Sequence, residues 1–239
     1  MMKKIIAASL AVSGLAFAAG AQAEAGDFVV RLRATSVSPD EGSSLGKKTD
    51  QAYGAGTAAA LYGNAGAELR VDSNLIPEID FSYYFTKNLA AELILATGTR
   101  HDVKTSSAGA LLNTTKLGSV DLLPPTLTLQ WHFMPDQSFD PYVGAGVNYT
   151  YFMDKNLTAN TVAGPQKIRL ESDSFGGALQ FGFDVNLKDR WLLNFDVKKV
   201  WINTDVKLNA PVLGVAGWQK IDSLDIDPWV ISVGIGKKF

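Results

Sequence analysis

Residues 191–201 read WLLNFDVKKVW, and residues 229–239 read WVISVGIGKKF. In the first stretch, apolar side chains such as Leu193 and Phe195 alternate with polar ones such as Asn194, which is the period of a β-strand with one apolar face. Both stretches begin and end with an aromatic residue on that face. At about 3.3 Å per residue and a tilt near 40°, such a strand climbs roughly 25 Å, the height of the apolar band of an outer-membrane barrel. Both stretches therefore predict strands that face lipid.

The same alternation recurs along the rest of the chain. It predicts further strands over residues 27–34, 78–85, 89–95, 123–133, 143–151 and 179–185. The connections alternate in length, with short turns at 86–88, 134–140 and 187–190 and long connections at 36–74, 98–121, 154–172 and 203–222. This sorting is typical of outer-membrane barrels. We expect an all-β fold, an eight-stranded antiparallel transmembrane up-and-down β-barrel. A secreted soluble barrel or sandwich is the alternative.

With the apolar faces outward, the polar faces line the inside of the barrel. Their candidate plug residues are Arg31, Arg33, Glu78, Asp80, Glu92, His132, Asp184, Asp196 and Lys198, with Lys238 further along. Eight strands enclose a space that side chains can fill, so we expect these groups to pair and plug the lumen, which disfavours a general porin. Arg31 and Arg33, facing Glu78 and Asp80, are the expected cross-strand pairs.

Two consecutive prolines, Pro124 and Pro125, stand where a long connection enters the strand at 123–133. Proline supplies no N–H to a β-ladder, so pairing there must be interrupted or displaced to a bulge. A gap in the barrel wall is one interpretation, and prolines that merely end a loop are the other. Leu122, Leu123 and Trp201 are the apolar residues expected near such an opening, although a girdle position also explains Trp201.

The N-terminus has the three regions of a secretory signal. Lys3 and Lys4 precede an apolar run over residues 5–18, and Ala21 and Ala23 supply small residues for cleavage. The run is shorter than the about 20 residues of a membrane anchor. We expect residues 1–23 to be a cleaved signal peptide and residues 24–239 to form the outer-membrane barrel with four long extracellular loops.

Composition excludes several function classes. The 239 residues contain no Cys, which removes thiol and zinc-thiolate chemistry, and the net charge of -2 offers no basic surface for nucleic acid. Enzyme signals are thin, because a lipase-like reading of His132 needs a serine within reach and nothing singles out Ser82 or Ser174. The spacing of His and carboxylate residues matches no metal site. We therefore expect no catalytic residue, no metal and no cofactor.

Several ordered segments resemble one family. Residues 123–127 read LPPTL, 130–131 read QW, 141–150 read PYVGAGVNYT and 227–230 read DPWV, and these are similar to the outer-membrane protein W (OmpW) family. Residues 203–206 also resemble its alkane-uptake relatives, the AlkL proteins. The chain departs from the family in its first long loop, which is extended and rich in Ala and Gly over residues 52–67, and in Lys237, although Gly234 and Phe239 fit the C-terminal assembly signal.

The resemblance implies a hydrophobic channel that is open to the outside and closed towards the periplasm. Pro124 and Pro125 match the family's Leu-Pro-Pro segment, and Arg100 and His101 resemble its Arg-His pair where a loop begins. The implied function is passive uptake of small hydrophobic molecules with lateral exit through the wall. A structural or receptor barrel whose loops bind external partners is the alternative. The implied partners are outer-membrane lipid and lipopolysaccharide, small apolar solutes and the outer-membrane assembly machinery.

Overall fold

The computed structural model describes residues 23–96, 99–210 and 215–239. Apart from Ala23, the expected signal peptide lies outside these residues. Within them, no helix has the length and apolar character needed to cross a membrane.

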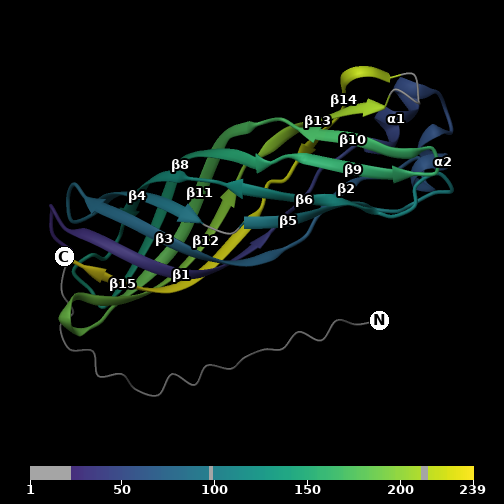
Figure 1. The fold of residues 1–239 in the computed structure, drawn as a ribbon. Helices are drawn as coiled ribbons and strands as arrows, with labels where there is room; N and C mark the ends of the chain where they lie inside the picture. The colour runs from purple at the N-terminus through teal and green to yellow at the C-terminus, as the bar shows by residue number, and fades with distance from the viewer. Residues whose placement is uncertain (1–22, 97–98, 211–214) are drawn as a thin grey trace.

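Eight long strands form a closed antiparallel barrel, as the alternation predicts (Figure 1). In chain order they are β1 (Phe28–Ser38), β3 (Asn74–Tyr84), β4 (Leu89–Ala96), β7 (Thr126–His132), β8 (Phe139–Asp154), β11 (Asp173–Asn186), β12 (Trp191–Val200) and β15 (Trp229–Lys238). The order around the wall is β11-β12-β15-β1-β3-β4-β7-β8, and pairing of β8 with β11 closes it.

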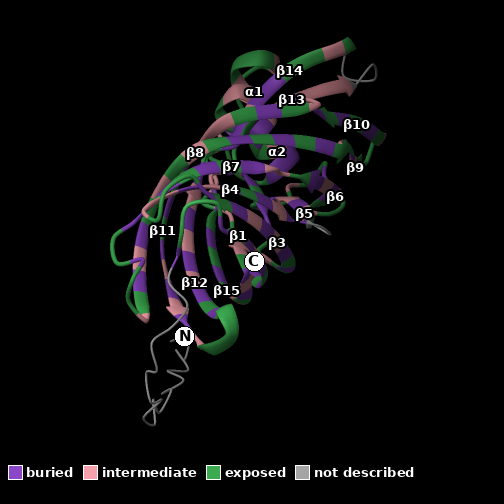
Figure 2. Ribbon diagram, turned by 90° about the vertical axis from the view of Figure 1, so that its left-hand side faces the viewer, coloured by how far each residue is buried: buried purple, intermediate pink, exposed green. Residues whose placement is uncertain are grey.

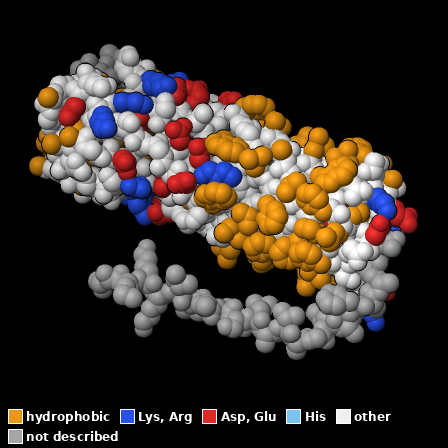
Figure 3. Space-filling model, turned by 180° about the vertical axis from the view of Figure 1, so that it is seen from behind, with side chains coloured by type: hydrophobic (Ala, Val, Ile, Leu, Met, Phe, Trp, Pro, Cys, Tyr) orange, Lys and Arg blue, Asp and Glu red, His pale blue; other side chains and the backbone are white. Residues whose placement is uncertain are grey.

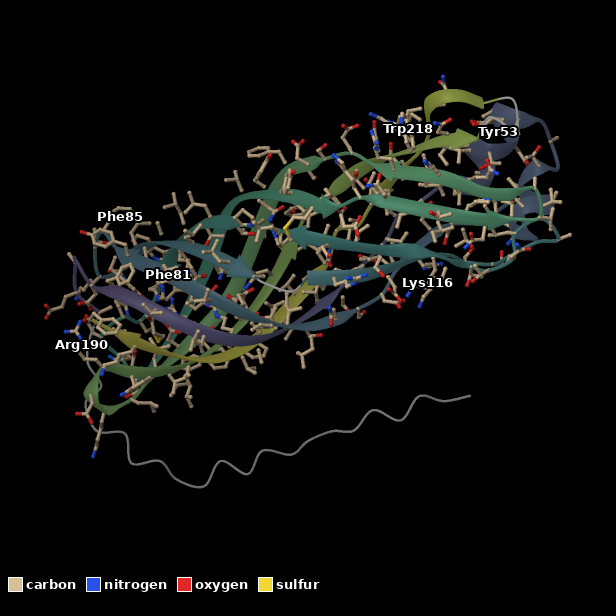
Figure 4. The ribbon with its side chains drawn as sticks, in the orientation of Figure 1. Tyr53, Phe81, Phe85, Lys116, Arg190 and Trp218 are labelled. Atoms are coloured by element: carbon tan, nitrogen blue, oxygen red, sulfur yellow. The ribbon has the colours of Figure 1, made fainter. Side chains whose placement is uncertain are left out.

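The barrel has two unlike ends. Three short turns and the C-terminus lie at one end, where the β11–β12 turn is a 3₁₀ segment, η1 (Lys188–Arg190), near the labelled Arg190 of Figure 4. The four long connections extend from the other end. In an outer-membrane barrel the short turns face the periplasm and the long connections face outside.

The long connections contain helices and strands of their own. One contains α1 (Leu45–Tyr53), α2 (Thr57–Tyr62) and β2 (Leu69–Val71), and the others contain β5 (Thr99–Thr105) and β6 (Lys116–Leu123), β9 (Asn156–Thr161) and β10 (Gly164–Leu170), and β13 (Asn203–Ala210) and β14 (Val215–Asp225). β6 pairs with the C-terminal end of β8, so the wall continues beyond the barrel. A separate sheet, β14-β13-β10-β9, completes this extracellular extension.

Apolar side chains cover the outside of the barrel, and charged ones cover the extension (Figure 3). Burial alternates along the barrel strands, as expected for a wall with one face turned outward (Figure 2). Lys199 and Lys237, which interrupt the apolar faces, each place the ammonium over a tryptophan, 5.1 Å from the ring centroid of Trp229 and 5.0 Å from that of Trp191. These contacts fit cations that snorkel at the two boundaries of a membrane.

Candidate functional site

The candidate plug residues all lie inside the barrel and are buried. They come from β1, β3, β4, β7, β11 and β12, because the period of two turns every second residue of each strand towards the axis. The side chains of Arg31, Arg33, Glu92 and Asp80 have no solvent exposure. Such ions are stable only where partners offset the cost of removing them from water.

Arg31, Arg33 and Lys198 each have two or more carboxylate partners, whereas the ammonium of Lys238, buried further along the barrel, has no hydrogen-bond partner among the described residues. The ion pairs are Arg31–Glu92 at 3.0 Å, Arg31–Asp184 at 2.7 Å, Arg33–Asp80 at 2.9 Å, Arg33–Glu78 at 3.2 Å, Arg33–Glu92 at 3.1 Å, Lys198–Glu78 at 3.0 Å and Lys198–Asp196 at 2.8 Å. Gln130 and Gln180 also donate to Glu92, at 2.7 and 2.8 Å. Side chains from opposite walls thus meet across the lumen and fill it.

The predicted cross-strand pairs hold for one arginine only. The register places Arg31 opposite Asp80 and Arg33 opposite Glu78, as expected. Arg33 bonds both predicted carboxylates, but Arg31 reaches across the lumen to Glu92 and Asp184. The expected pairing of Arg31 was wrong because, in so narrow a barrel, the opposite wall is as close as the neighbouring strand.

His132 lies at the base of the plug and does not meet a serine. Its Nδ1 is 2.8 Å from Asp140 Oδ2, and its Nε2 is 3.1 Å from the hydroxyl of Tyr84. Ser82 instead contacts Arg31 and Glu92. The arrangement satisfies the imidazole ring in the barrel interior and assembles no serine nucleophile at His132.

An apolar cavity lies directly above the plug. Its volume is about 60 Å³, and one water molecule needs about 10–15 Å³ when volume is counted in the same way. Glu78 and Lys198 of the plug form its floor, with Thr35, Thr126 and Asn148 beside them. The apolar walls are Val37, Pro39, Val71, Ile76, Ile94, Ala96, Leu122, Pro124, Val200, Ile202, Ile226, Pro228 and Val230. This cavity, with the interrupted wall beside it, is the candidate site.

Most of the residues that form the cavity walls were not identified from the sequence, although the sequence contains a pattern that indicates them. The inward face of several strands changes from charged to apolar towards the extension. On β12, Asp196 and Lys198 are followed at the same spacing by Val200, and on β4, Glu92 is followed by Ile94. Inward apolar residues at one end of a barrel strand therefore indicate a cavity above the polar plug.

The wall beside the cavity is interrupted at the two prolines. β4 pairs with β7 only from Leu89 to Ile94, because β7 begins at Thr126, directly after Pro125. The Asn148 amide donates to Thr126 Oγ1 at 2.9 Å and to the carbonyls of Pro124 and Pro125 at 3.3 Å. The prolines are thus held against β8, while the last residues of β4 lack β7 as a partner.

The residues predicted near an opening fall into two groups. Leu122, Pro124 and His101 line the cavity. Arg100, Leu123, Pro125 and Trp201 do not line it. Arg100 is 3.8 Å from Asp121 on the outside, and Trp201 lies on the outer surface against Gly177 of β11.

His101 is the one ring nitrogen donor among the cavity walls. It is buried, and its Nδ1 lies 2.8 Å from the carbonyl oxygen of Asp72. A carbonyl only accepts, so the Nδ1–H of His101 is the donor of this hydrogen bond. The hydrogen bond fixes the ring between β5 and the segment that follows β2.

Comparisons with known proteins agree with this architecture. The model of the OmpW family matches residues 24–239. Outer membrane protein W of Escherichia coli strain K12 is 35% identical over 240 residues, covering 100% of both chains. The crystal structure of the outer membrane protein OprG from Pseudomonas aeruginosa has a TM-score of 0.74 at 34% identity and covers 91% of this chain and 98% of its own. The structure of outer membrane protein AlkL in lipid bilayers has a TM-score of 0.58 at 22% identity, covering 95% and 96%, and supports the fold alone.

These matches span the barrel and its extension together. The relatives are outer-membrane proteins, and nothing in their names points to catalysis. The chain belongs to the OmpW family and is a β-barrel protein of the Gram-negative outer membrane.

Proposed function

We propose that this protein mediates passive uptake of small hydrophobic molecules, which leave the barrel sideways into the membrane. The observation that carries the proposal is the apolar cavity above a charged plug, beside the interruption at Pro124 and Pro125. The driving force is burial of solute surface, about 25 cal/mol per Å². The process requires neither energy coupling nor covalent chemistry.

The plug supports a lateral route over a straight one. A solute in the cavity faces the buried ion pairs of Arg33, Glu78 and Lys198 below it. Passing through them would break contacts whose loss leaves uncompensated charges in the barrel. The wall towards β7 offers apolar side chains, Ile94 and Leu122, and fewer ladder hydrogen bonds.

Filling the cavity tests the uptake proposal. Ile94 is 3% exposed and lines the cavity, whereas its neighbour Leu93 is 38% exposed and faces outward. In proteoliposomes, we expect Ile94→Trp to reduce uptake of a labelled alkane by about tenfold, and Leu93→Trp to leave it unchanged. Equal uptake by the two variants, or uptake no faster than in protein-free liposomes, contradicts the proposal and favours a receptor with a closed lumen.

The exit route has its own test. Valines in place of Pro124 and Pro125 restore the N–H groups that a β-ladder needs. We expect the double variant to slow uptake while the solute still enters the cavity, and Pro165→Val, in β10 of the extension, to have no effect. Conductance of porin size through the native protein would instead indicate an open path through the plug.

The partners in this proposal are the solute and the surrounding membrane. The barrel surface contacts outer-membrane lipid, and Lys199 beside Trp229 lies at its outer boundary, where lipopolysaccharide carries its anionic groups. The C-terminal Phe239, with Gly234, remains the predicted signal for the outer-membrane assembly machinery.

A further inference from the structure

The first long connection forms a roof over the tip of the extension. This stretch is rich in Ala and Gly, and it folds into α1 and α2 (Figure 1). Gly54 and Gly63 follow the two helices with φ of 100° and 75°, a conformation that favours glycine. Asp50 Oδ1 accepts a hydrogen bond of 2.7 Å from the N–H of Ala58 and so caps the start of α2.

Hydrogen bonds and an ion pair hold this roof, the segment with α1 and α2, against neighbouring segments on both sides. Asp222 of β14 has no solvent exposure and accepts from Ser43 Oγ at 2.7 Å, and its other oxygen lies 2.9 Å from Lys48 Nζ. On the side of α2, the carbonyl of Leu61 accepts from the N–H of Gly109 at 2.8 Å. α1 is therefore tied to β14, and α2 to the connection between β5 and β6.

An outer cavity of about 180 Å³ lies between the roof and this hairpin. Its lining is Thr49, Tyr53, Thr57, Leu61 and Tyr62 from the helices and Leu208 and Ile221 from the hairpin. Figure 4 shows Tyr53 at the tip of the extension, far from Phe81 and Arg190 on the barrel. On the measure where one water needs about 10–15 Å³, the outer cavity has room for a small organic molecule.

The lining offers hydrogen bonds as well as apolar surface. The hydroxyls of Thr49 and Tyr62 share a long hydrogen bond of 3.5 Å, so the one that accepts it keeps its own proton for a guest, and both keep acceptor lone pairs. Burial raises the pKa of the Tyr53 and Tyr62 phenols above its ordinary value. Both phenols thus keep their protons at neutral pH and can donate.

The outer cavity leads towards the barrel. Leu61, Tyr62, Leu208 and Ile221 also line a second cavity of about 30 Å³ directly below it. That second cavity is lined by Leu69 of β2, two residues before Val71, which lines the cavity above the plug. The second cavity therefore shares α2 and the hairpin β13–β14 with the outer cavity, and β2, β5 and β6 with the cavity above the plug.

We propose that the outer cavity is a binding site for a small, mostly apolar compound with one hydroxyl or carbonyl group, phenol being the simplest probe. It rests on the proposed uptake function, for which it is the first binding site on the path from outside. The apolar walls hold the ring of the guest, and the hydroxyls of Thr49 and Tyr62 bond its polar group.

The test is NMR titration of the full chain in lipid nanodiscs with phenol and, separately, benzene. We expect phenol to shift the amides of Thr49, Leu61 and Ile221 saturably, and more tightly than benzene does. Thr49→Val keeps the shape but removes the hydroxyl, so it should weaken phenol binding several-fold and leave benzene binding unchanged.

A second variant tests the proposal by filling the outer cavity with a larger side chain. Leu208→Trp should weaken phenol binding by about tenfold or more, whereas Val162→Trp, at a 62% exposed position of the same extension, should not. Phenol shifts confined to the barrel, or equal binding by both variants, overturn the proposal. If uptake responds to Ile94→Trp but phenol does not bind here, only the outer site fails. If phenol binds here but uptake ignores Ile94→Trp, only the uptake function fails.

Discussion

Glu92 accepts ion pairs from both arginines of the plug, with its carboxylate fully buried. Glu92→Ala leaves the charges of Arg31 and Arg33 with fewer partners, and removing one member of a buried ion pair typically costs about 3–5 kcal/mol. We expect a loss of that size in the free energy of unfolding, measured by denaturant titration in lipid vesicles.

Lys87→Ala is the matched control for that measurement. Lys87 pairs with Asp136 at the periplasmic turns, where both side chains are exposed, and exposed pairs contribute no more than about 1 kcal/mol. If Glu92→Ala costs no more than Lys87→Ala, the plug does not depend on its ion pairs.

At this scale, the inward position of each plug residue was predictable and its partners were not. Alternation along one strand decides which face a residue takes, and the register set Arg33 opposite Glu78. Arg31 bonds Asp184, which lies 153 positions later in the chain. Such a contact depends on the closure of the whole barrel, which no local pattern contains.

At the scale of elements, Gly146 allows β8 to approach β7. A Cβ there would lie 1.9 Å from the carbonyl oxygen of Leu127, so the backbones would have to separate. We expect Gly146→Ala to cost at least the about 1–3 kcal/mol of ordinary overpacking and to lower the folded fraction seen by heat-modified gel mobility. Gly42→Ala, whose nearest contact would be Asp225 Oδ2 at 3.5 Å, should fold like the native chain.

Lowering the pH should destabilise the sheet of β9, β10, β13 and β14 before it destabilises the barrel. A hydrogen bond from Lys207 lowers the pKa of Glu171, and one from Lys220 lowers that of Asp205. A carboxylate whose pKa is lower in the folded than in the unfolded state stabilises the fold at pH values above its unfolded pKa. This stabilisation is lost as the pH falls below the ordinary pKa values of about 4.5 for Glu and 3.8 for Asp.

Hydrogen exchange measures this effect. Between about pH 6 and about pH 3, protection factors in β10 and β13 should fall by less than about tenfold, since exposed pairs contribute little, while those in β1 stay constant. Lys207→Met should remove part of the pH dependence. Equal loss of protection in β1 and β13 would contradict a role for the extension's own carboxylates.

The barrel strands were predictable as elements, whereas the extension was not. Each barrel strand has a long alternating run that faces lipid on one side, as from Trp191 to Val200. β9 has a single buried apolar residue, Leu157, and β10 begins with Gly164 and Pro165. These short strands are stabilised by packing against other long connections, so their own residues carry little signal.

At the scale of the whole molecule, the apolar band and the charged extension divide the surface (Figure 3). The division follows from the solvent on each side, because charges at the lipid face cost about 2–4 kcal/mol at mid-membrane and little near the interfaces. It places the cavity above the plug at the outer part of the membrane. The outer cavity, under α1 and α2, lies beyond it.

Tryptophan fluorescence can check this placement. Trp131, Trp191, Trp201 and Trp229 are 40–49% exposed on the barrel surface, whereas Trp218 lies in the extension. In variants that keep one tryptophan each, brominated lipids should quench the four barrel residues several-fold more than Trp218, because bromine quenches only at contact range. Since the four lie near the two boundaries, bromines close to the headgroups should quench them more than bromines at the chain ends. Quenching of Trp218 equal to that of Trp229 would place the extension in lipid and overturn the assignment of both cavities.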